Sequence, residues 1–172
     1  MMRRVSSQNT PRDAPLPDHW WADEMLGRLA RYLRMVGLDT TYQLGLSDDE
    51  VLRRSQAEGR TLLTRDRALA RYAPGSVLLM RPLIEDQWHE LQRRFPLWPN
   101  EPRFVRCTLC NGRLKEVPAD VEVTPLSEVP RDVLSSGRLV YQCPDCRHHY
   151  WEGSHTESMR RRLSRWSVER GP

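Results

Sequence analysis

Four cysteines constrain this chain more than any other feature. They form two Cys-x-x-Cys pairs, Cys107 with Cys110 and Cys143 with Cys146, and the 172 residues contain no other cysteine. Paired motifs of this kind are typical of a zinc ion held by four thiolates. Such a site has no open coordination position, so the pattern predicts a structural zinc centre rather than a catalytic one.

Two disulfides are the alternative use of four cysteines. They would need an oxidising compartment, and residues 1–10 lack the apolar segment of a secretory signal. We therefore expect a cytoplasmic protein with reduced thiols. His148, His149 and His155 offer alternative ligands, but four cysteines already complete a tetrahedral set. The long segment 111–142 predicts an insertion between two zinc knuckles.

The composition points to an arginine-rich, basic protein. The net charge is +4, and Lys115 is the single lysine among 27 basic residues. The planar guanidinium group of arginine matches the geometry of a phosphate, which favours a nucleic-acid partner. A codon preference for arginine would produce the same bias. No apolar run is long enough for a membrane span, so no membrane association is expected.

Strand-like and helix-like patterns alternate through the first hundred residues. The run 19–22 predicts a buried strand, and 24–36 shows helical spacing before a stop at Gly37. Ser47 and Glu50 form a capping box sequence. The other predicted elements are an extended segment at 39–44, a helix from Ser47 to Gly59, strands at 61–64 and 77–80, a helical turn at 66–71 and a helix at 84–95. This alternation predicts an α/β fold with a parallel sheet flanked by helices, followed by a small zinc-ribbon module.

Composition also predicts where the domains divide. We expect a disordered N-terminal arm at 1–18, an α/β domain at 19–96, a proline-rich linker at 97–102, a zinc ribbon at 103–155, and a basic C-terminal helix and tail at 156–172.

Acidic residues follow two of the predicted strands. Asp23 comes directly after 19–22, and Asp66 comes shortly after 61–64. Ligands of open α/β sheets bind beyond the carboxyl ends of the strands, so neighbouring strands would bring these acids together. Asp48 and Asp49, at the start of a predicted helix, are further candidates. Converging carboxylates suit Mg²⁺ or Mn²⁺. The alternative is that each acid only caps or stabilises a helix start.

Arginines accompany these acids. Arg65 and Arg67 flank Asp66 and are candidates for holding phosphates. Arg28, Arg31 and Arg34 recur every three residues on the first predicted helix. Arg28 is a further candidate for RNA contact, but a solvated helix face is the favoured interpretation of this series.

Several motifs in order resemble the Mut-seven C-terminal ribonuclease-like domain family, a PIN-like fold that carries a zinc ribbon. The resemblance runs from about His19 to Met159. It rests on Asp23-Glu-Met-Leu-Gly-Arg-Leu-Ala-Arg-Tyr-Leu-Arg, Gly37-Leu-Asp39-Thr40, Leu63-Thr64-Arg65-Asp66, Arg106-Cys107-x-x-Cys110-Asn111, Cys143-Pro-x-Cys146 and Tyr150-Trp151-x-Gly153-Ser154-His155.

The resemblance implies a nuclease that cuts RNA with a divalent metal, with Asp23, Asp66 and either Asp48 or Asp49 as metal-binding acids. PIN nucleases generally carry a fourth acid shortly after the position of Asp66. This chain has Arg67-Ala-Leu-Ala there and supplies no acid.

Two functions follow as hypotheses. The first is a metal-dependent ribonuclease with Mg²⁺ or Mn²⁺ at its acidic site, and the alternative is a non-catalytic RNA- or ribosome-associated module that retains the fold and the ribbon. A toxin with an antitoxin partner is disfavoured, because single-domain toxins rarely need a zinc module. No sequence feature predicts an oligomeric state.

Overall fold

A computed structural model describes residues 15–95, 98–117 and 129–167. The predicted disordered arm therefore lies mostly outside the described residues, as do parts of the predicted linker, ribbon and C-terminal tail. The chain forms two compact units: residues 1–27 with 42–98, and residues 28–41 with 99–172. Segment 28–41 thus groups with the C-terminal part, while the predicted domain boundaries stay a prediction.

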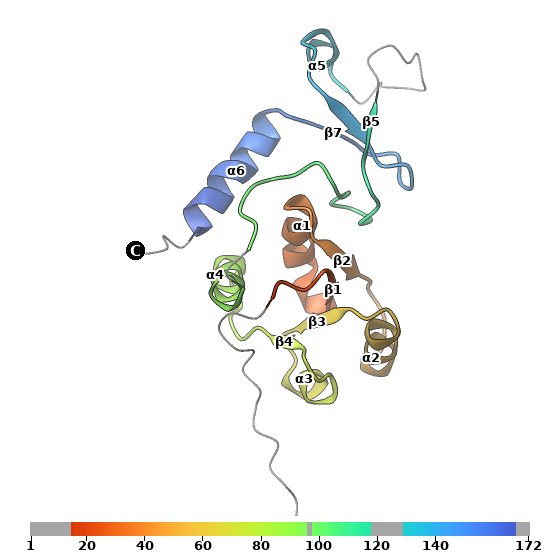
Figure 1. Ribbon diagram of the computed structural model, residues 1–172, viewed down its shortest axis with the longest axis vertical. Helices are drawn as coiled ribbons and strands as arrows, with labels where there is room; N and C mark the ends of the chain where they lie inside the picture. Colours follow the sequence, from red (N-terminus) through yellow and green to blue (C-terminus); the bar gives the residue numbers. More distant parts are fainter. Residues whose placement is uncertain (1–14, 96–97, 118–128, 168–172) are drawn as a thin grey trace, which may run out of the picture. The chain divides into compact units, whose positions relative to one another are not determined.

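A parallel four-stranded sheet confirms the predicted α/β class (Figure 1). Its strands are β1 (His19–Ala22), β2 (Asp39–Tyr42), β3 (Thr61–Thr64) and β4 (Val77–Leu78), in the order β2-β1-β3-β4. The predicted strand at 77–80 is thus shorter in the structure. β1 and β3 are neighbours in the sheet although β2 lies between them in the sequence. Parallel neighbours cannot be joined by a tight turn, so the chain crosses over between these two strands.

Helices of the first unit pack on both faces of β1 and β3. They are η1 (Glu24–Leu26), α2 (Asp48–Ala57), α3 (Arg67–Tyr72) and α4 (Ile84–Arg94). Trp21 and Leu62 are register partners and pack with Val51 of α2 and Leu69 of α3. Trp20 points to the opposite face, as strand alternation requires, and its ring lies 5.3 Å from Phe95 at the end of α4. The core therefore consists of two apolar layers, one on each face of the paired strands β1 and β3.

The second unit contains α1 (Gly27–Met35) and the cysteine module. A three-stranded antiparallel sheet runs in the order β5 (Lys115–Val117), β6 (Val140–Gln142) and β7 (His149–Trp151). The short helix α5 (Arg131–Ser135) was not predicted, whereas α6 (Ser154–Trp166) matches the predicted basic helix. Val129, Val133 and Val140 form a small core beneath this sheet.

The predicted helix stops and starts are largely confirmed. Gly37 has a φ of +92°, and the amide of Leu38 donates to Leu33 O at 2.9 Å, which is the Schellman arrangement at the end of α1. Ser47 Oγ accepts from the amide of Glu50 at 3.3 Å, so one half of the capping box forms. The Glu50 carboxylate instead binds the guanidinium groups of α2 and does not complete the box.

No helix among the described residues combines the length and the apolar character that a membrane crossing requires.

The layer between β3, α2 and α3 gives a stability prediction. Leu62 is 2% exposed, so Leu62→Ala should lower the free energy of unfolding by about 2–5 kcal/mol through lost burial and an unfilled cavity. Leu44 is 67% exposed, and Leu44→Ala should change it by less than about 0.5 kcal/mol. Urea unfolding followed by tryptophan fluorescence measures both, and equal losses would contradict this account of the core.

Candidate active site and zinc centre

The ladder between β1 and β3 ends beside the two predicted acids. Ala22 is the register partner of Leu63, and the amide of Asp23 continues the ladder by donating to Leu63 O at 2.9 Å. Asp66 follows two residues after the end of β3. Parallel pairing therefore places Asp23 and the β3–α3 turn at the same sheet edge.

Thr64 links the two acidic positions. Its hydroxyl donates to Asp23 Oδ2 at 2.8 Å and accepts from the amide of Asp66 at 2.9 Å. Asp23 Oδ1 accepts from the amide of Glu24 at 2.6 Å. Thr64 is fully buried and Asp23 is 7% exposed, so this carboxylate is held from both sides in a largely water-excluded position.

Asp66 caps α3 with only one of its carboxylate oxygens. Oδ1 accepts from the amides of Ala68 and Leu69, at 2.6 and 3.1 Å. Within the described parts of the chain, no hydrogen bond reaches Oδ2. The capping alternative is thus observed for both acids, but a carboxylate has about four acceptor sites, and these contacts leave some of them for a cation.

The remaining predicted site residues are not gathered in the same way. Asp48 and Asp49 are exposed in the first turn of α2. Among the described residues, the four cysteines form the one group of three or more His, Cys, Asp or Glu side chains arranged to hold a metal ion, and the predicted acids form no such group. Arg67 and Arg28 are exposed. Arg65 is half-buried, and its buried Nε has no hydrogen-bond partner among the described residues. The roles of these residues stay predictions.

The four cysteines converge as predicted. All four Sγ atoms lie within 4.8 Å of one another, and the pairs Cys107–Cys146 and Cys110–Cys143 are 3.4 Å apart. Tetrahedral zinc with Zn–S bonds of about 2.3 Å separates its sulfurs by about 3.8 Å. The distances therefore fit a four-thiolate zinc site and exceed a disulfide bond of about 2.05 Å. None of the described histidines belongs to the cluster.

Two matching turns shape the site. Asn111 N donates to Cys107 O, and Arg147 N donates to Cys143 O, each at 2.9 Å. Asn111 and Arg147 both have left-handed φ, +72° and +66°. Gly112 lies where a Cβ would come within 2.9 Å of Cys143 Sγ, so a side chain there would crowd the second turn.

The thiols differ in their electrostatic surroundings. Burial acts to raise the pKa of Cys107, but hydrogen bonds from Tyr150 and from the amides of Cys110 and Leu109 outweigh it and lower the pKa to about 7. Burial raises the pKa of Cys110 to about 12 and also raises that of Cys146. Tyr150 Oη, 3.1 Å from Cys107 Sγ, also accepts from Thr108 N at 3.0 Å. A positively charged ion among these sulfurs would favour the thiolate form of all four.

A buried arginine joins the first knuckle to α1 and β2. Arg34 is 3% exposed and donates to Thr40 O at 2.8 Å, Leu109 O at 2.8 Å and Thr108 O at 3.2 Å. Burial lowers its pKa, while the nearby thiols of the cluster act to raise it. The predicted solvated face is therefore wrong for Arg34, although Arg28 and Arg31 are exposed.

Asn111 and Arg106 extend this connection. Asn111 Oδ1 accepts from the amide of Thr40 at 3.0 Å, and its Nδ2 donates to Asp39 Oδ1 at 2.8 Å. Arg106 forms an ion pair with Asp39 Oδ2 at 2.8 Å. The knuckle thereby satisfies the backbone and side chains at the start of β2, and Asp39 has a structural role there.

Sequence reasoning missed Thr64, Tyr150 and the buried role of Arg34. Only Arg34 carried a signal. Arginines spaced three residues apart are displaced around the helix axis by about −60° at each step, so they do not all lie on one face. Arg34 follows Ala30 by four residues and therefore lies within about 40° of that buried side chain around the axis. In a sequence, a threonine at the end of a strand looks the same whether its hydroxyl binds two acidic residues or faces solvent.

The Mut7-C RNAse domain model matches residues 18–163. The chain belongs to the Mut7-C RNAse domain family. The matched range includes both Asp23 and Asp66 and all four cysteines. No curated protein matches the sequence.

Removing the buried guanidinium should destabilise the second unit. Arg34→Met leaves three carbonyls without their donor, so we expect a loss of about 2–4 kcal/mol in unfolding free energy and faster release of zinc to a chromogenic chelator. Arg31→Met, on the exposed side of the same helix, is the matched control and should change neither quantity. If both variants had the same unfolding free energy and the same rate of zinc release, the stabilising role of the Arg34 hydrogen bonds would be refuted.

Zinc content should depend on the cysteines alone. The purified protein is expected to contain about one zinc per chain by elemental analysis, because four thiolates complete a closed site. Cys107→Ser should lose that zinc and make the second unit sensitive to proteolysis. His155→Ala should retain it, since His155 lies outside the cluster. Zinc loss in His155→Ala, or full retention in Cys107→Ser, would contradict the ligand set.

Proposed function

We propose that this protein is a metal-dependent ribonuclease whose acidic site is centred on Asp23 and Asp66. The observation that carries the proposal is the hydrogen-bonded series Asp23–Thr64–Asp66 at the carboxyl ends of β1 and β3. Membership of the Mut7-C RNAse domain family supports ribonuclease chemistry in general. The hydrogen bonds of Thr64 at the ends of β1 and β3 support the assignment of this chemistry to Asp23 and Asp66.

The acids fit a hard divalent cation such as Mg²⁺ or Mn²⁺. A buried carboxylate is costly unless a cation or hydrogen bonds compensate its charge, and Asp23 has two neutral donors but no ion pair among the described residues. Asp66 Oδ2 offers a second oxygen. Asp48 and Asp49 remain candidates for a further ligand. Such a cation, when bound, supplies Lewis-acid stabilisation and a more acidic water.

Side chains and backbone amides of this chain would orient the two acids and hold the phosphate of the substrate. Thr64 and the amide of Glu24 fix the direction of the Asp23 carboxylate, and the cap of α3 fixes that of Asp66. Arg65, which is half-buried, and Arg67, which is exposed, flank Asp66 and are the candidates for holding a phosphate. Arg28 is a further candidate for RNA contact.

The proposed reaction is hydrolysis of a phosphodiester. The oxygen of an attacking water bonds to phosphorus, the bond from phosphorus to the 3′ oxygen breaks, and that oxygen gains a proton. The products carry a 5′-phosphate and a 3′-hydroxyl. In-line attack requires the water and the leaving oxygen on opposite sides of the phosphorus, so the site must fix both the phosphate and the acids.

Cleavage of labelled RNA in Mn²⁺ tests the proposal. Asp23→Asn and Asp66→Asn should each lower the rate by at least about 100-fold, since each removes a charged ligand from the site. Asp132→Asn, which removes an exposed acid from α5, is the control and should leave the rate unchanged. Equal zinc content in all variants excludes an effect through the ribbon.

Two outcomes would count against the proposal. Unchanged cleavage by both aspartate variants would show that another site or a contaminant cuts the RNA. Absence of cleavage together with RNA binding that is indifferent to both aspartates would instead support the alternative, a non-catalytic RNA- or ribosome-associated module.

A further inference from the structure

Helix α6 has two chemically distinct faces. Leu163 and Trp166 are buried, and the Trp166 ring lies 4.9 Å from that of Tyr32 on α1. Arg162 lies on the same side and donates to Tyr32 Oη at 2.6 Å. The apolar stripe of the helix is therefore occupied within the second unit, and the charge of Arg162 is used internally.

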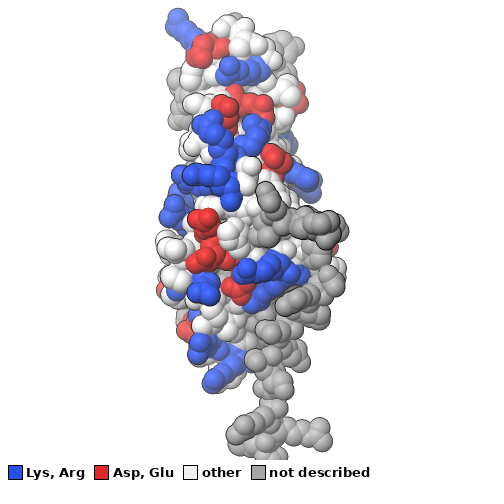
Figure 2. All heavy atoms as spheres, turned by 90° about the vertical axis from the view of Figure 1, so that its left-hand side faces the viewer, with Lys and Arg blue, Asp and Glu red and all other residues white. Residues whose placement is uncertain are grey.

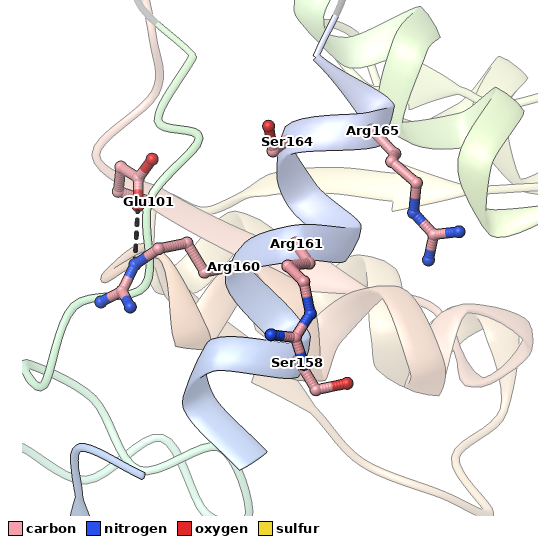
Figure 3. Close-up of a pocket in the computed structure, with 6 residues that line it drawn as sticks. All are labelled: Glu101, Ser158, Arg160, Arg161, Ser164 and Arg165. Carbon is pink, nitrogen blue, oxygen red and sulfur yellow. Dashed lines mark ion pairs between the residues drawn. The ribbon is translucent and has the colours of Figure 1, made fainter. Parts of the chain in front are cut away.

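The opposite face of α6 is entirely polar. At about 100° per residue, Arg161, Ser164 and Arg165 fall at least about 100° from both Leu163 and Trp166, and Ser158 and Arg160 flank this arc. They line an open hollow of about 710 Å³ together with Glu101 (Figure 3). The lining side chains are Ser158, Arg160, Arg161, Ser164, Arg165 and Glu101.

Acidic side chains neutralise this face only in part. Four arginines and one glutamate give α6 a net charge of +3. Arg160 contacts Glu101 at 3.3 Å and Glu152 at 3.0 Å, and Arg161 contacts Glu157 at 3.3 Å. Arg165 forms no ion pair with any residue in the described ranges. Figure 2 shows basic side chains with acidic side chains interspersed among them on the face that it draws.

These contacts are of the kind that a stronger anion displaces. The side chains of Arg161 and Glu157 are 64% and 62% exposed, and exposed pairs of this sort contribute about 0–1 kcal/mol. A phosphate offers a planar guanidinium a bidentate contact and releases condensed counterions as well. The arginines can therefore exchange internal partners for phosphates at little cost.

We propose that the polar face of α6 binds the backbone phosphates of RNA. This inference rests on the proposed function for the identity of the polyanion. Arg161 and Arg165 would contact successive phosphates, and the hydroxyls of Ser158 and Ser164 would donate to the same oxygens, as serine commonly does in nucleic-acid complexes.

An anionic membrane fits this face less well. Amphipathic helices that lie on membranes insert an apolar face among the lipids. In α6 that face is already buried, and the exposed arc contains only arginine and serine beside Glu157. A nucleic acid that is bound through its phosphates alone needs no apolar contact from the protein.

A matched pair of double variants tests the inference. Arg161→Gln/Arg165→Gln removes one ion-paired and one unpaired arginine from α6. Arg53→Gln/Arg71→Gln removes the same charge from α2 and α3, where Arg53 pairs with Glu50 at 2.7 Å and Arg71 has no ion pair among the described residues. Fluorescence anisotropy with a single-stranded 20-nucleotide RNA, without added Mg²⁺ or Mn²⁺, gives Kd at several salt concentrations.

The α6 variant should bind about tenfold more weakly at moderate salt, and the slope of log K against log salt should fall by roughly 1.4, for two phosphate contacts on a single strand. The α2/α3 control should stay within twofold of the parent. Arg161→Lys/Arg165→Lys should keep most of the affinity, because it retains both charges. Equal Kd values for the two glutamine variants would overturn the inference, as would a loss seen only with phosphatidylserine vesicles and not with RNA.

Failure of this inference and failure of the proposed function are distinguishable. A parent protein that cleaves RNA, combined with an α6 variant that binds RNA as the parent does, overturns the inference alone. A parent that never cleaves RNA, combined with α6-dependent binding, leaves the inference standing and removes the nuclease assignment.

Discussion

The pairing of β1 with β3 is the constraint on which the candidate active site depends. Three register pairs align the strands, and one further backbone hydrogen bond, from Asp23 to Leu63, carries the ladder into the first acid. A shift of one residue would turn Trp20 and Trp21 to the wrong faces, so burial of these two rings fixes the register. The position of Asp23 beside the end of β3 thus depends on this register.

The second unit depends on a different kind of interaction, the buried guanidinium of Arg34. A cysteine knuckle presents backbone carbonyls that need donors, and a short edge strand presents backbone groups that need partners. Arg34 and Asn111 satisfy both at once, by binding Thr108, Leu109 and Thr40. The zinc ribbon is consequently bound to α1 and β2 through polar contacts of defined geometry. An apolar contact would have been less specific about their relative placement.

The proposed chemistry and the proposed RNA contact involve different elements of this chain. Four thiolates around one zinc ion leave no position for a substrate, whereas the hydrogen bonds to Asp23 and Asp66 orient carboxylates that are the proposed cation ligands. The arginines of α6 belong to neither set. Their exposed face suits a backbone rather than a reaction centre, because guanidinium groups contribute charge and orientation but transfer no proton.

The sequence by itself determined the elements whose signal is local. Spacing identified the four cysteines that converge, apolar runs indicated β1 and β3, and Gly37 and Ser47 marked the end and start of helices. Tertiary structure decided the rest, because partners distant in sequence compete for the same group. Glu50 binds arginines instead of completing its capping box. Arg34 is buried because Thr108 and Leu109, more than seventy residues away, supply carbonyls for its guanidinium. Thr64 links Asp23 to Asp66 only because two strands, separated by some forty residues, lie in register.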